Sequence, residues 1–135
     1  MSRKVLILGG GGFIGSSISR ILADRKYDIT IADNFHLNQD DNIFLEFVKK
    51  NNIRLIKSDF SNPSSFDLLD DNYDDFYMLA SMIGVNKTLE IPHEIIRINT
   101  ALIYNSLEWV KSKKIKNVLF TSTSECYSGT IDKFN

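Results

Sequence analysis

The sequence of 135 residues contains a single cysteine, Cys126, and only two prolines. One cysteine excludes an internal disulfide framework and a metal site built from cysteines, and it fits a reducing compartment. No apolar stretch approaches the roughly 20 residues that a membrane-spanning helix requires. Neither sign of charge is in excess, because 16 Lys and Arg stand against 17 Asp and Glu. A nucleic-acid-binding surface needs a basic excess. We therefore expect a cytoplasmic protein that binds neither nucleic acid nor a membrane.

A metal site is not expected either. His36 and His93 lie far apart in the sequence, with no acidic or cysteine partner at the spacing of metal ligands. The aspartates between Asp67 and Asp75 lack the glycine and the terminal Glu of a calcium loop. We interpret this cluster as a solvated loop.

What the sequence does contain is an alternation of short apolar runs with segments of helical periodicity, typical of a parallel sheet covered by helices. Its length suits a single domain. The expected strands are residues 5–8, 28–32, 53–56, 76–80 and 118–121. The expected helices are about 14–22, 42–50, a helix beginning at Pro63, and a long helix over about 92–113.

A glycine-rich loop follows the first expected strand and precedes the first helix. Gly9, Gly12 and Gly15 stand three residues apart. Such a turn favours φ > 0, which Gly adopts at little cost. A missing side chain lets a pyrophosphate approach the backbone, and the third glycine lets the helix pack against the strand. The N–H groups of the first helical turn then bind the anion. The alternative interpretation is a flexible turn.

Asp33 ends the second expected strand, about 20 residues beyond the glycines. A carboxylate at this place accepts hydrogen bonds from both ribose hydroxyls of an adenosine and repels a 2′-phosphate. No Lys or Arg lies between Asp33 and Lys49 to bind that phosphate. The sequence therefore predicts NAD rather than NADP. The alternative role for Asp33 is to cap its own loop.

The remaining strand ends carry weaker signals. Asp59 follows the third strand, where it could reach an adenine amino group, although capping the helix near Pro63 is an equal alternative. Small residues at Leu79-Ala80-Ser81 leave room for a cofactor across the fourth strand, but they could simply pack well.

Hydroxyl side chains follow the fifth expected strand in Thr121-Ser122-Thr123-Ser124, and Glu125 comes next. Each buried hydroxyl needs a hydrogen-bond partner. We expect Thr123 or Ser124 to donate to a sugar hydroxyl or keto oxygen, and Glu125 to act as an acid or base. A plain Ser/Thr-rich turn is the alternative.

Several motifs occur in a fixed order along the chain. They are Gly9-x-x-Gly12-Phe13-Ile14-Gly15, Asp33-Asn34, Asp59-Phe60, Leu79-Ala80-Ser81, Asn99-Thr100 followed by Asn105-x-Leu107-Glu108, and Ser122-Thr123-Ser124-Glu125-Cys126-Tyr127-Ser128. Together they resemble the N-terminal portion of the extended short-chain dehydrogenase/reductase family, the NAD-dependent nucleotide-sugar epimerases and dehydratases. The resemblance covers essentially the whole chain.

This resemblance implies a Rossmann-type, doubly wound parallel sheet of strand order 3-2-1-4-5. It implies NAD as cofactor and a nucleotide-sugar substrate that passes through a transient 4-keto sugar. Thr123 would hold the family's catalytic Ser/Thr position, beside Ser124 and Glu125, and Glu125 favours the dehydratase and decarboxylase branches. The implied cofactor-binding residues are Gly9, Gly12, Phe13, Ile14, Gly15, Asp33, Asn34, Asp59, Phe60, Leu79, Ala80, Ser81, Asn99 and Thr121, with Asn99 as the structural helix asparagine. A homodimer through the 92–113 helix is implied as well.

The family also needs a Tyr with a Lys four residues on, and the sequence contains no Tyr-x-x-x-Lys. We expect residues 1–135 to be an incomplete NAD-binding domain of a longer enzyme, truncated before the family's last strands and its sugar-binding domain, and inactive alone. The alternative is a non-catalytic NAD-binding or sensing module. A third possibility is a flavin or another adenine-nucleotide binder, because the loop recognises pyrophosphate.

Overall fold

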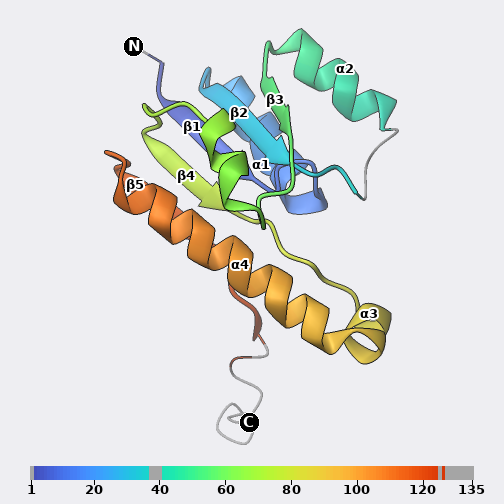
Figure 1. Cartoon of the computed structure of the whole chain (residues 1–135). Coiled ribbons are helices and arrows are strands. Elements are labelled where there is room, and N and C mark those ends of the chain that lie inside the picture. Colours follow the sequence, from blue (N-terminus) through green and yellow to red (C-terminus); the bar gives the residue numbers. More distant parts are fainter. Residues whose placement is uncertain (1, 37–40, 125, 127–135) are drawn as a thin grey trace, which may run out of the picture.

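A computed structural model describes residues 2–36, 41–124 and 126 (Figure 1). All strand pairs are parallel, and they form one five-stranded sheet in the order β3-β2-β1-β4-β5. The predicted sheet and its strand order are confirmed. The strands are β1 (Lys4–Leu8), β2 (Asp28–Asp33), β3 (Arg54–Lys57), β4 (Asp75–Met78) and β5 (Asn117–Phe120).

Helices lie on both faces of the sheet, as Figure 1 shows, although every residue of the edge strand β5 is exposed. The elements on one face are α1 (Phe13–Asp24) and α2 (Asn42–Lys50). The other face carries the 3-10 helix η1 (Pro63–Leu68) and the long helix α4 (Pro92–Lys111). The short helix α3 (Val85–Glu90) lies beside the first turns of α4. No helix among the described residues is both long enough and apolar enough to cross a membrane.

The central strand β1 divides the hydrophobic core into two halves. Successive side chains of a strand point to opposite faces of the sheet. Val5 and Ile7 accordingly pack under α1 and α2, whereas Leu6 and Leu8 pack under η1 and α4. All of them are almost fully buried. This burial explains why the strand is an unbroken apolar run, as expected of a parallel sheet covered on both faces.

Trp109 anchors α4 to the sheet through a cluster of aromatic rings. Its ring centroid lies 5.8 Å from that of Phe66, 5.6 Å from Phe76 and 6.2 Å from Tyr73. These separations are within the range at which aromatic pairs attract one another. The anchor fixes α4 across the sheet face, so that its middle turns lie beside the loops that follow β3 and β4.

The strand ends differ from the expected bounds by one or two residues, and three further features differ in kind from the sequence-based expectations. The helix beginning at Pro63 is a 3-10 helix capped by Asn62, and helix α3 was not expected at all. The third difference is the aspartate cluster, which is not simply a solvated loop. Asp75 is buried in β4 and is bound by the Arg3 guanidinium at 2.5 and 2.7 Å. A charge can be buried there because a cation and hydrogen bonds compensate it.

Candidate functional site

A cleft of about 670 Å³ lies at the carboxyl edge of the sheet, where the loops after all five strands meet. Carboxyl ends of parallel strands line the ligand crevice in folds of this kind. The residues that line the cleft are Leu8, Gly9, Gly11, Gly12, Phe13, Ile14, Gly15, Asp33, Asn34, Phe35, His36, Ser58, Asp59, Phe60, Leu79, Ala80, Ser81, Met82, Ile83, Lys87, Ile98, Leu102, Thr121 and Ser122. Most of the residues predicted to bind the cofactor therefore share one cavity.

Gly9 and Gly15 are required by the packing of the loop itself. Gly9 adopts a φ of 83°, in the region that favours glycine, and a Cβ there would lie 2.5 Å from the backbone nitrogen of Ala80. A Cβ on Gly15 would lie 2.5 Å from the Cα of Gly10. Helix α1 thus approaches the loop so closely that no side chain fits between them, as the spacing of the glycines predicted.

Gly12 is different, because the protein leaves space beside it. A Cβ added there would meet only the Gly9 carbonyl oxygen, at 3.5 Å, which is an ordinary contact. Gly12 is the N-cap of α1, and it has no side chain that could accept a hydrogen bond from the first turn of that helix. The backbone N–H groups at a helix start bind anions, helped by the helix dipole. A side chain at residue 12 would therefore extend into open space beside the first turn of α1, where an anion could bind.

Asp33 lies at the end of β2 and lines the cleft. Its Oδ2 accepts from the Gly11 N–H at 2.9 Å, and its Oδ1 accepts from the Phe35 N–H at 2.8 Å. The carboxylate therefore supports both its own loop and the glycine loop. Each carboxylate oxygen has a further lone pair. Loop support, the alternative role predicted for Asp33, is confirmed. The ribose contact stays a prediction, for a carboxylate that also lines the cleft.

Asp59 and Phe60 follow β3, and both line the cleft. Asp59 does not cap η1, because Asn62 does, by accepting from the Ser64 N–H. The Asp59 Oδ1 instead accepts from the Ser61 N–H at 2.9 Å. Of the two alternatives predicted for Asp59, helix capping is wrong, and the side chain faces the cleft.

The ends of β4 and β5 form the wall opposite the first helical turn. Leu79, Ala80 and Ser81 line the cleft, and the backbone of Ala80 lies against Gly9. Thr121 also lines it, and its hydroxyl donates to the Met78 carbonyl. The lining reaches Ser122 but does not include Thr123 or Ser124, which are exposed. Glu125, predicted as an acid or base, lies outside the described residues.

Asn99 lies behind this wall rather than in it. Its Oδ1 accepts from the Met82 N–H at 2.7 Å, and its Nδ2 donates to the Met82 carbonyl at 3.0 Å. Both polar atoms of the carboxamide are therefore engaged with the loop after β4. This arrangement agrees with a structural asparagine on the long helix, and Asn99 is absent from the lining of the cleft.

Sequence reasoning missed some residues of the cleft. His36 was interpreted as loop surface, and it is exposed but lies at the cleft. Lys87 is half-buried and lines the cleft from α3. Because the segment before Pro92 has no clear helical periodicity, α3 was not expected, and nothing in the sequence placed Lys87 near the glycine loop. No group of three or more metal-ligating side chains occurs among the described residues.

Residues 5–133 match the model described as the NAD dependent epimerase/dehydratase family. The UDP-N-acetyl-alpha-D-glucosaminuronate decarboxylase of Bacillus cytotoxicus is 35% identical over 127 residues, which are 94% of this chain and 38% of that protein. The UDP-Glc/GlcNAc 4-epimerase of Campylobacter jejuni superimposes with a TM-score of 0.81 at 25% identity, over 93% of this chain and 39% of the other.

A UDP-glucose 4-epimerase of Bifidobacterium longum, solved with NAD+ and UDP, has the same fold. Its TM-score is 0.79 at 21% identity, over 92% of this chain and 38% of the other. The chain therefore spans a little over a third of the length of these similar proteins.

Proposed function

The chain belongs to the NAD dependent epimerase/dehydratase family, and from this premise we propose that residues 1–135 are the NAD-binding domain of an enzyme that acts on a nucleotide sugar. NAD is the cofactor of that family. The similar proteins act on UDP-sugars, according to their names. A UDP-sugar is therefore the substrate class that we propose for the complete protein, with a decarboxylase or an epimerase reaction.

The observation that carries the proposal is the shared cleft, which is lined by the glycine loop, the carboxylate of Asp33 and the small residues Ala80 and Ser81. The first turn of α1 would hold the diphosphate. Asp33 would accept from the adenosine ribose, and Asp59 would face the adenine. The small side chains of Ala80 and Ser81 leave room for the nicotinamide half beside the ends of β4 and β5.

NAD supplies a hydride acceptor to an enzyme of this kind. The chain's own contribution is to position the substrate and to move a proton. We propose that the Thr123 hydroxyl hydrogen-bonds to the sugar oxygen from which the proton leaves, beside Ser124, and that Glu125 acts as acid or base. A transient 4-keto sugar would follow. Thr123 and Ser124 do not line the cleft themselves, but they directly follow Ser122, which does, and this adjacency supports the assignment.

Titration of the chain with NAD, NADP and FAD tests the cofactor. We expect NAD to bind more tightly than NADP, because the carboxylate of Asp33 repels a 2′-phosphate. We expect it to bind more tightly than FAD because NAD is the cofactor of the family. Replacement of Asp33 by Ala should weaken NAD roughly tenfold, the effect of losing about 1.4 kcal/mol of hydrogen bonding, while NADP binding stays or improves.

The comparison of NAD with NADP is needed because Asp33 also supports the glycine loop. Damage to that loop would weaken both dinucleotides equally, whereas loss of the ribose contact changes their ratio. Asp28→Ala is the matched control, since Asp28 lies at the other end of the same strand. If the ratio of the affinities for NAD and NADP is the same in Asp33→Ala as in the wild type, the proposed contact of Asp33 with the ribose is wrong. If the wild type binds FAD more tightly than NAD, the proposal that NAD is the cofactor is wrong.

A second candidate function is a module that binds NAD without turnover. No Tyr-x-x-x-Lys occurs within residues 1–135, so these residues alone do not distinguish that module from the enzyme. Coding sequence that continues beyond Asn135 into such a pair would support the enzyme, and a stop codon at that point would support the binding module.

A further inference from the structure

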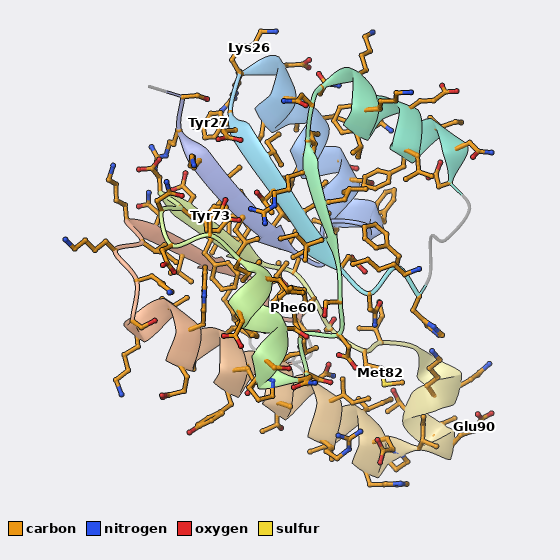
Figure 2. The ribbon with its side chains drawn as sticks, turned by 45° about the horizontal axis from the view of Figure 1, so that its top comes forward. Lys26, Tyr27, Phe60, Tyr73, Met82 and Glu90 are labelled. Atoms are coloured by element: carbon orange, nitrogen blue, oxygen red, sulfur yellow. The ribbon has the colours of Figure 1, made fainter. Side chains whose placement is uncertain are left out.

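Helix α4 binds the loop that follows β3 through one side chain. The Nδ2 of Asn105 donates to the Ser61 carbonyl at 2.8 Å and to the Phe60 carbonyl at 3.3 Å. Figure 2 shows Phe60 next to η1, on the face of the sheet that also carries α4. The side chain of Asn105 is half-buried. One carboxamide therefore fixes the backbone of a loop that lies more than 40 residues earlier in the chain.

Residues near this loop hydrogen-bond to both the backbone carbonyl and the carboxylate of Asp59. The Asp59 carbonyl accepts from the Ser65 hydroxyl at 2.6 Å, and that hydroxyl also lies 2.8 Å from the Ser58 hydroxyl. The Asp59 carboxylate accepts from the Ser61 N–H at 2.9 Å. Ser61 is thus bound at both of its backbone polar groups, by Asp59 through its N–H and by Asn105 through its carbonyl.

We propose that Asn105 is a positioning residue for the adenine end of the cleft, acting through Ser61 on the carboxylate of Asp59. The inference rests on the proposed NAD site. An adenine amino group donates to a carboxylate, whereas a purine with a keto group at that position would face it with a second acceptor. A site built to accept a hydrogen bond discriminates against an analogue that lacks the donor. Asn105 therefore contributes to the selection of adenine without touching the cofactor.

The test compares the affinities of the chain for NAD and for nicotinamide hypoxanthine dinucleotide, measured by calorimetry. A hydrogen bond to a charged group is worth about 1.5–3 kcal/mol, so the wild type should prefer NAD by at least about tenfold. In Asn105→Ala we expect this preference to fall to less than about threefold. Asp59→Asn should remove the preference as well, and the double variant should add nothing to the loss of either single variant.

Asn99→Ala is the matched control. It removes the same kind of carboxamide bonds from the same helix, but those bonds reach the Met82 backbone. We expect this variant to change the affinities for the two dinucleotides by the same factor. If Asn105→Ala fails to fold, as judged by its thermal transition, Asn105→Ser carries the test, because its shorter side chain also loses the reach to both carbonyls.

The possible results separate the two proposals. If the wild type binds neither dinucleotide, the proposed function itself fails. If the wild type binds both but without preference, or if Asn105→Ala weakens both by one factor, the NAD site stands and the role of Asn105 is overturned. A preference that collapses in Asn105→Ala and Asp59→Asn but survives in Asn99→Ala supports the inference.

Discussion

The glycines of the loop after β1 differ in whether the fold leaves room for a side chain. The protein itself demands the absence of a side chain at Gly15, where a Cβ would lie 2.5 Å from another backbone atom. At Gly12 a Cβ would meet only the Gly9 carbonyl oxygen, at 3.5 Å. The fold itself therefore tolerates a side chain at Gly12, and the diphosphate that we propose to bind there would be what excludes one.

Two single substitutions separate these demands. Gly12→Ala should fold with a thermal midpoint close to that of the wild type but bind NAD at least about tenfold more weakly, because its methyl group enters the space for the diphosphate. Gly15→Ala should lower the free energy of unfolding by roughly 1–3 kcal/mol and therefore unfold at a lower temperature. The reason is that its methyl group would collide with the backbone of Gly10, and only a backbone shift relieves this contact. Calorimetric unfolding and NAD titration of both variants measure the two effects. Equal loss of stability in the two variants would contradict this distinction.

At this scale the sequence was sufficient for roles that depend on a residue and its neighbours in the chain. The φ of Gly9 and the place of Asp33 at a strand end follow from a strand, a turn and a helix in succession. It was not sufficient for Asp59, because the spacing did not distinguish a side chain that faces an adenine amino group from one that caps the helix near Pro63. Nor could it place Asn105, whose partners are distant in the sequence.

Among the elements, the amino ends of three strands are joined by one buried carboxylate. Asp75 of β4 accepts from Arg3, which precedes β1, and from Asn117 of β5 at 2.8 Å. Burial by itself would raise the pKa of Asp75. The hydrogen bonds from Arg3 and Asn117 together outweigh this effect, so that the pKa stands below its ordinary value. The ionised form is therefore the one that stabilises this edge of the sheet.

The pH dependence of stability follows from that direction. A carboxylate with a lowered pKa stabilises the fold above its unfolded pKa, near 3.9, and the stabilisation is lost as the pH falls through the folded pKa. We expect Asp75→Asn to lower the thermal midpoint at pH 7, and the difference from the wild type to shrink below about pH 4. Asp67→Asn, at an exposed position in η1, is the control. A difference that stays constant from pH 7 to pH 3 would contradict the role of the charge.

The elements that were predictable from the sequence are those with strong periodicity or complete burial. The long helix was expected over about 92–113 and is observed over Pro92–Lys111, because its apolar residues recur on one face. Helix α3 spans only Val85–Glu90, too short for a periodic pattern to form. The aspartates between Asp67 and Asp75 were wrongly expected to form a solvated loop. A run of acidic residues in the sequence shows neither that Asp75 lies in a strand nor that Arg3 binds it.

For the whole molecule, α4 presents an apolar stripe to solvent. Ile96, Ile103 and Leu107 are 67%, 37% and 59% exposed, and their spacing places them along one side of the helix. Exposed apolar side chains grouped in this way indicate an interaction surface. The homodimer expected from the sequence through this helix stays a prediction, and the stripe supports it.

Sedimentation measurements over a range of concentrations test the dimer. The wild type should show a concentration-dependent dimer, and Leu107→Glu should shift it to monomer because a charge at the contact is left unpaired. Leu45→Glu, on the exposed side of α2, is the matched control and should leave association unchanged. A monomeric wild type, or loss of the dimer in the control variant alone, would contradict an interface on α4.

The residues that stabilise the sheet through an ion pair and the residues that line the cleft lie at opposite ends of the strands. The ion pair of Arg3 with Asp75 lies at the amino edge of the sheet, and the cleft lies at the carboxyl edge. A strand of five residues, such as β1, keeps the edges about 16 Å apart. Free-energy changes at sites this distant are usually additive. Descendants of this sequence can therefore gain or lose thermal tolerance at one edge while selection on ligand recognition proceeds independently at the other.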